Sequence, residues 1–108
     1  MNEVPVISPA ELRSELDAGA DLLLVDVRES DELEISVLPN VIHIPMDDLP
    51  ARFEEIPKDS NIVMICRTGN RSGKTTDFLL HQGYTKVRNM ATGMNGYATT
   101  VDHSMKTY

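Results

Sequence analysis

Apolar residues along this 108-residue chain occur in short runs that are separated by polar segments with helical spacing. The runs predict five strands, at residues 4–7, 22–27, 41–44, 61–66 and 86–90. Continuous apolar runs such as "LLLV" and "NIVMI" are typical of strands that are covered on both faces. The segments between the runs predict helices at residues 9–19, 30–35, 47–56, 72–82 and 93–100. This alternation predicts an α/β fold, an open and mainly parallel five-stranded sheet with helices on both faces.

Several residues mark where these helices begin and end. Ser8 is a suitable cap because Pro9 can occupy the first helical position and Glu11 can return a hydrogen bond to the cap. Gly19 and Gly83 are placed to end their helices, whereas Pro50 is expected to break the helix at 47–56 early. Residues 101–108 are expected to form a fraying C-terminal tail. The length predicts one domain, residues 1–108.

Composition and charge narrow the possible partners. The chain is 41% hydrophobic and 25% charged, as expected of a globular protein, and its net charge is −7. Acidic surfaces repel phosphate backbones, so no broad nucleic-acid interface is predicted. We interpret the acidic clusters as solvated surface; they are Asp31, Glu32 and Glu34, then Asp47 and Asp48, then Glu54 and Glu55.

The same features bear on location. No signal peptide and no membrane-spanning run are predicted. One cysteine cannot form an internal disulfide, which favours a cytoplasmic setting.

The single cysteine, Cys66, stands where the fourth apolar run gives way to "RTGNRS". Ligands gather at the carboxyl ends of parallel strands. Gly69 and Asn70 tolerate left-handed backbone angles and predict a tight turn, which can aim several amide N–H groups inward. The next helix and the side chains of Arg67 and Arg71 add positive potential. We therefore expect the pKa of Cys66 to fall from about 8.5 to roughly 3.5–7.5, leaving a nucleophilic thiolate that is open to anionic solutes.

The alternative for Cys66 is a small buried apolar residue, and for the two arginines a plain surface role. The turn favours the functional interpretation, because a merely packed cysteine needs no such sequence after it. Arg71 stands at the start of a helix, where a positive side chain opposes the helix dipole. We expect a bound anion to compensate for it there.

Four segments resemble the rhodanese family of sulfurtransferases, over about residues 8 to 97. "LLLVDVRESDELE" resembles that family's strand-and-turn signature, with Asp26 and Arg28 in matching places. "LPNVIHIP" resembles the segment that leads to a strand ending at Pro45. "CRTGNRS" resembles the active-site loop, and "VRNMATGMNGY" resembles the closing segment, with Tyr97 where an aromatic residue is common.

The resemblance implies a thiosulfate sulfurtransferase that works in two half-reactions. Cys66 would take the outer sulfur of a donor such as thiosulfate, become a persulfide, and pass that sulfur to cyanide or a thiol. The loop amides would stabilise the anionic sulfur, Arg67 and Arg71 would help to place the donor, and Asp26 with Arg28 would form a supporting ion pair. No metal or organic cofactor is implied, and the acceptor must come from outside the chain. The implied substrate-binding loop comprises Arg67, Thr68, Gly69, Asn70, Arg71 and Ser72.

The sequence departs from the family pattern in two places. Ser36 and Val37 stand where the family often has a Gly–His pair, and Thr92 replaces one glycine of a usual pair. We expect these changes to affect packing and access rather than chemistry.

Two other enzyme classes fit less well. Cysteine-dependent phosphatases and the related arsenate reductases place five residues between cysteine and arginine, but four separate Cys66 from Arg71, and Ile65 replaces their usual histidine. The smaller ring suits a persulfide sulfur better than a phosphate. "GNRSGKTT" approaches a nucleotide-binding loop, yet three residues rather than four separate Gly69 from Gly73.

A further alternative is a sulfur-carrier or regulatory interaction module that uses the same cysteine without turnover. No metal site is predicted, because His43, His81 and His103 share no ligand spacing with Cys66.

Overall fold

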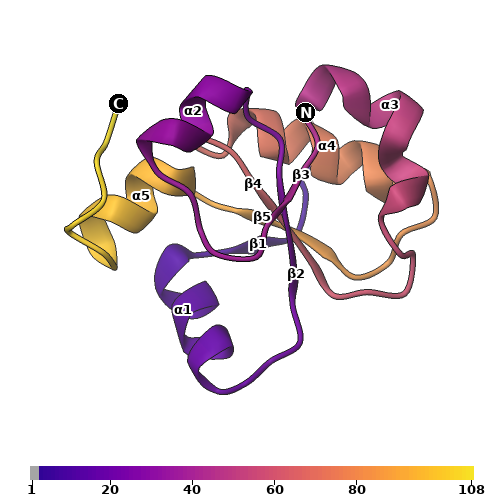
Figure 1. Ribbon diagram of the computed structural model, residues 1–108. Coiled ribbons are helices and arrows are strands. Elements are labelled where there is room, and N and C mark those ends of the chain that lie inside the picture. The colour runs from indigo at the N-terminus through magenta and orange to yellow at the C-terminus, as the bar shows by residue number, and fades with distance from the viewer. Residues whose placement is uncertain (1–2) are drawn as a thin grey trace.

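The computed structural model describes residues 3–108 and contains one five-stranded sheet (Figure 1). All strand pairs are parallel, and the spatial order is β1-β5-β4-β2-β3. The predicted α/β fold is therefore confirmed. The strands are β1 (Val6–Ile7), β2 (Leu23–Asp26), β3 (Ile42–His43), β4 (Ile62–Ile65) and β5 (Val87–Met90).

Helices cover both faces of this sheet. Figure 1 shows α1 and α5 on one side of the strands and α3 and α4 on the other. None of the helices within residues 3–108 combines the length and apolar character that crossing a bilayer requires. The helices are α1 (Pro9–Asp17), α2 (Ser30–Ile35), α3 (Leu49–Arg52), α4 (Asn70–His81) and α5 (Gly93–Thr100), with 3-10 turns η1 (Met46–Asp48) and η2 (Phe53–Glu55) on either side of α3.

Alternate residues of the central strands supply two separate cores. In β4, Val63 and Ile65 pack with residues of α1 and α5, whereas Ile62 and Met64 pack with residues of α3 and α4. Successive side chains of a strand point to opposite faces, so a strand that is covered on both faces must be apolar at every position. Cys66 continues this alternation and belongs to the core on the α4 side.

The helix boundaries follow the sequence closely at the first helix and less closely later. Ser8 and Glu11 form the expected reciprocal cap, with distances of 3.1 and 2.9 Å. The helix expected at 72–82 instead begins at Asn70, behind Gly69, whose φ of 99° only glycine adopts readily. The segment expected at 47–56 is helical but consists of three consecutive short pieces, η1, α3 and η2. Pro50 does not end the helix as expected, because it lies within the first turn of α3, where no amide hydrogen is required.

The C-terminal residues fold back onto the domain, which differs from the expectation of a fraying tail. The backbone N–H of Tyr108 donates to the Asn95 side chain at 3.1 Å, and the Asn95 amide donates to the carbonyl of Tyr108 at 3.0 Å. Met105 packs against the core on the α1 side. The tail therefore reaches the end of the sheet that carries Cys66.

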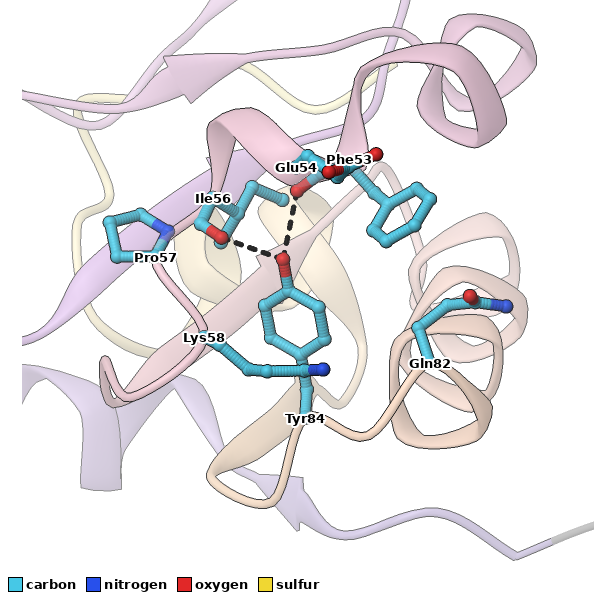
Figure 2. Close-up of a pocket in the computed structure, with 7 residues that line it drawn as sticks. All are labelled: Phe53, Glu54, Ile56, Pro57, Lys58, Gln82 and Tyr84. Atoms are coloured by element: carbon cyan, nitrogen blue, oxygen red, sulfur yellow. Dashed lines mark hydrogen bonds between the residues drawn. The ribbon is translucent and has the colours of Figure 1, made fainter.

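A hollow of about 420 Å³ lies between the η2 segment and the turn that follows α4 (Figure 2). Figure 2 shows Tyr84 rising between Lys58 and Phe53, and its hydroxyl lies 2.9 and 2.6 Å from the carbonyls of Phe53 and Ile56. These contacts join the two segments. Neither Cys66 nor a residue of the loop that follows it lines this hollow, so the hollow is a different site from the cysteine loop.

Candidate active site

Cys66 directly follows β4, whose neighbours in the sheet are β5 and β2. The cysteine therefore lies at the carboxyl end of the central strand, where parallel sheets place their ligands. A three-residue turn then leads into α4 at Asn70. This short connection brings the first turn of α4 back over the sulfur.

Hydrogen-bond donors converge on the cysteine sulfur. The backbone N–H of Gly69 lies 3.1 Å from Sγ, and the hydroxyl of Ser72 lies 3.2 Å from it. Burial is the largest single influence on the pKa of Cys66 and raises it. The hydrogen bonds from the Ser72 hydroxyl and from the N–H groups of Ser72, Gly69 and Thr68 together outweigh burial, so the pKa lies below the ordinary value for a thiol. The loop therefore stabilises the thiolate relative to that of an ordinary cysteine.

The amino end of α5 orients the peptide groups of this loop. Met94 donates its backbone N–H to the carbonyl of Cys66 at 2.9 Å, and Asn95 donates to the carbonyl of Arg67 at 3.0 Å. Carbonyls that face α5 leave the following N–H groups free to face the sulfur. Gly93 permits this approach, because an added Cβ would lie 2.5 Å from the Cys66 carbonyl oxygen.

The side chain of Cys66 is only 1% exposed, which differs from the expectation of an open thiolate. The loop and the first turn of α4 enclose the sulfur while they donate hydrogen bonds to it. A hollow of about 320 Å³ adjoins the loop, and Gly69, Asn70 and Asn89 help to line it, but Cys66 does not. The sulfur therefore presents little surface to solutes in this structure.

Arg71 has a partner within the chain. Its guanidinium donates to both carboxylate oxygens of Glu32 on α2, at 2.6 and 2.8 Å. The pKa of Arg71 is raised, first by Glu32 and to a lesser degree by the charge of Cys66. The structure thus supplies from α2 the compensation that the sequence analysis assigned to a bound anion. It also corrects the interpretation of Glu32 as solvated surface.

Arg67 contacts Tyr108 of the C-terminal tail, next to the Glu32–Arg71 pair. The guanidinium carbon of Arg67 lies 5.0 Å from the ring centre of Tyr108, within the range of a cation–π contact. The Tyr108 hydroxyl donates to Glu32 at 2.7 Å and accepts from Arg28 at 2.9 Å. Tyr108 therefore connects both loop arginines to a network of charged side chains.

Asp26 and Arg28 form a fully buried ion pair at the end of β2. The Arg28 guanidinium donates to the two Asp26 oxygens at 2.9 and 2.8 Å, and both side chains are 0% exposed. Arg28 also donates to the carbonyls of Glu32 and Ser36, at 3.3 and 2.7 Å. The pair thereby ties β2 to the C-terminal turn of α2, the helix that supplies the partner of Arg71.

Three residues have a place in this site that the sequence did not predict: Glu32, which was expected to be solvated surface, and Asn89 and Tyr108. The side-chain amide of Asn89 on β5 donates to the carbonyl of Gly69 at 3.0 Å, and its oxygen lies 2.5 Å from the Ser72 hydroxyl. Asn89 lies two positions after Val87 in β5, so strand alternation places it on a core-facing side, and a polar residue at such a position is a usable signal. Nothing local in the sequence marks Glu32 or Tyr108.

The Glu32–Arg71 pair predicts a pH-dependent contribution to stability. Arg71 is the main cause of a Glu32 pKa of about 2, below its usual 4.5. The unfolded chain takes up this proton more readily, so the contribution is complete above pH 4.5 and is lost as the pH falls toward 2. With allowance for solvent screening, we expect Glu32→Gln to reduce the acid-induced loss of stability by about 1 kcal/mol.

Urea unfolding between about pH 6 and pH 3 measures this effect. Glu34→Gln is the matched control, because Glu34 is an exposed carboxylate of the same helix. If both variants showed the wild-type dependence on pH, the Glu32–Arg71 pair would not be its source.

Fold and site together define a class of protein: a parallel α/β domain in which a loop of inward-facing N–H groups encloses a cysteine. Residues 8–100 match the rhodanese-like domain, and the chain belongs to this family. YtwF, a candidate sulfurtransferase of Bacillus subtilis, is 39% identical over 92 residues, which cover 85% of this chain and 88% of YtwF. A sulfurtransferase of Allochromatium vinosum is 37% identical over 92 residues, covering 85% and 86% of the two chains. The human single-domain sulfurtransferase TSTD1 superposes with a TM-score of 0.76 at 28% identity, covering 91% of this chain and 98% of TSTD1.

Proposed function

We propose that this protein is a sulfurtransferase that carries sulfane sulfur on Cys66. The observation that carries the proposal is the convergence of the Gly69 N–H and the Ser72 hydroxyl on Sγ, at 3.1 and 3.2 Å. Such a loop stabilises negative charge on sulfur both before and after it accepts a second sulfur atom. The relatives described above support sulfur transfer as the reaction class.

In the first half-reaction, the Cys66 thiolate attacks the outer sulfur of thiosulfate. A new S–S bond forms, the S–S bond of the donor breaks, and sulfite leaves with the electron pair. The product is a persulfide anion on Cys66. In the second half-reaction, cyanide or an external thiolate takes the outer sulfur, and the Cys66 thiolate is restored with the electron pair of the broken bond.

In this reaction the loop amides of residues 67–71 stabilise the negative charge on the outer sulfur of the persulfide. The side chains of Arg67 and Arg71 bind the anionic sulfur donor. Both arginines contact partners within the chain, Tyr108 and Glu32. A doubly negative donor would compete with those partners for the guanidinium groups.

Intact mass after incubation with thiosulfate tests the proposal. We expect the wild type to gain the mass of one sulfur atom and to lose it on addition of cyanide, whereas Cys66→Ser gains nothing. Ser keeps the size of the side chain, so the loop stays filled. Equal labelling of both proteins would remove Cys66 from the reaction.

A second measurement separates an enzyme from a sulfur carrier. With excess thiosulfate and cyanide, an enzyme forms thiocyanate continuously, while a carrier forms no more than one equivalent per chain.

A further inference from the structure

The hydroxyl of Ser72 lies between two hydrogen-bond acceptors. It is 3.2 Å from Sγ of Cys66 and 2.5 Å from Oδ1 of Asn89. All three side chains are buried, with exposed fractions of 0% for Ser72, 1% for Cys66 and 7% for Asn89. A serine hydroxyl carries one proton and donates it in one direction at a time. The sulfur and the amide oxygen therefore compete for a single proton.

The amide of Asn89 is held in one orientation. Its nitrogen donates to the carbonyl of Gly69 at 3.0 Å, which turns its oxygen toward Ser72. The reversed amide would place its oxygen against the Gly69 carbonyl oxygen, which already accepts the backbone N–H of Gly73 at 3.0 Å, and two acceptors cannot bond to each other. Asn89 thus presents a permanent acceptor to Ser72.

We propose that Asn89 is a positioning residue, which sets the proton affinity of Cys66 by competing with the sulfur for the Ser72 hydroxyl proton. In the thiol form, the S–H group donates to Ser72 Oγ, and Ser72 donates to Asn89. When the thiol ionises, Ser72 turns its proton to the thiolate, and Asn89 Oδ1 loses its donor. A buried acceptor without a donor is costly, so Asn89 limits how far the loop can favour the thiolate.

Limiting the fall of the Cys66 pKa would benefit the proposed sulfur transfer. The benefit, but not the competition for the proton, rests on that proposed function. The nucleophilicity of a thiolate falls as its pKa falls, and attack is fastest when the pKa lies near the ambient pH. A loop that only stabilised the thiolate would make Cys66 a weaker nucleophile. Asn89 opposes this loss.

Other charged and titratable groups also surround the loop. From α4 come Arg71, Lys74 and Asp77, and from α2 comes Glu32, the partner of Arg71. Arg67 lies in the loop itself. The hydrogen bonds of the Asn89 side chain go to Ser72 and Gly69 and to none of these charged groups, so Asn89→Leu keeps their charges in place. The other elements contribute Asp26 and Arg28 at the end of β2, Arg88 of β5, Tyr97 of α5 and Tyr108 of the tail. Arg88 pairs with Glu15, and the hydroxyl of Tyr97 accepts a hydrogen bond from Arg13.

The test is the pH titration of the Cys66 thiolate by ultraviolet absorbance, with Cys66→Ser as the blank that removes the tyrosine signal. Asn89→Leu keeps the volume and removes the acceptor. We expect the Cys66 pKa to fall by roughly one unit, the equivalent of one hydrogen bond. A merely structural role for Asn89 would loosen the Gly69 turn and raise the pKa instead. An unchanged or raised pKa in folded Asn89→Leu would overturn the proposal.

A double variant tests whether the effect passes through Ser72. Ser72→Ala removes the shared proton, so adding Asn89→Leu to it should produce no further fall in the Cys66 pKa. A fall of the same size in this background would overturn the proposal. If Asn89→Leu did not fold, Asn89→Ala would take its place in both titrations. Because no sulfur donor is present, failure here is distinguishable from failure of the proposed sulfur transfer.

Discussion

Replacing Gly93 by alanine is expected to lower the free energy of unfolding by about 2–5 kcal/mol. Gly93 has a φ of 59°, a region that costs a side-chain-bearing residue energy. An added Cβ would also fall onto the carbonyl oxygen of Arg67 and lie 2.5 Å from that of Cys66. These carbonyls cannot move away without weakening their hydrogen bonds from Met94 and Asn95.

Gly19→Ala is the matched control for this prediction. Gly19 has a φ of 83°, and an added Cβ there would have no neighbour within 4 Å, so only the backbone cost of about 1–2 kcal/mol applies. Urea unfolding of the two variants separates backbone strain from steric overlap. Equal losses in both would mean that the close approach of α5 to the cysteine loop contributes nothing measurable.

The Gly93 variant should also disturb the sulfur. The carbonyls that lie against Gly93 are those of Cys66 and Arg67. Each belongs to the same peptide group as the N–H of the next residue, Arg67 or Thr68. A shift of these peptides would weaken the N–H groups that lower the Cys66 pKa. Stability and thiolate chemistry therefore depend on the same contact between α5 and the loop.

The order of strands and helices was predictable because it depends on local patterns. The fully apolar strand β4 and the reciprocal cap at Ser8 and Glu11 each lie within a few consecutive residues. The cysteine loop was equally local, since its turn glycine and its donors lie within six residues of Cys66. A periodic or capping signal of this kind needs no knowledge of the tertiary structure.

Contacts between distant residues were not predictable in the same way. Glu32 and Arg71 are 39 positions apart, and Glu32 and Tyr108 are 76 apart. An acidic cluster on a short helix has the composition of solvated surface, and only the packing of α2 shows that Glu32 faces the loop. The contacts of the tail were not predictable for the same reason, because Asn95, the partner of Tyr108, carries no local sign of the contact.

The departure at Thr92 illustrates compensation within one segment. Thr92 adopts a φ of 64°, which a glycine would favour. Its side chain occupies the space that a Cβ at position 96 would need, and Gly96 leaves that space free. The pair of positions, rather than Thr92 alone, explains how the segment keeps its turn.

Removing the charge of Arg28 is expected to be among the most destabilising single changes in this domain. Arg28→Met would leave the Asp26 carboxylate at 0% exposure without its ion-pair partner. Breaking a buried ion pair in this way costs about 3–5 kcal/mol, because a charge remains in a medium that solvates it poorly. Thermal and urea unfolding measure the loss. The free energy of unfolding should fall even though Arg28 contacts no atom of Cys66 in the contacts described above.

The double variant Asp26→Asn/Arg28→Met identifies the cause of that loss. Asn is close to Asp in size and keeps an oxygen that can accept the backbone N–H of Arg28, which lies 3.1 Å from Asp26 Oδ1. The double variant should therefore be more stable than Arg28→Met alone, since no unpaired charge remains buried. If its loss instead equalled the sum of the two single losses, the hydrogen bonds of Arg28 to α2 and Tyr108, and not the pairing with Asp26, would be what stabilises this end of the sheet.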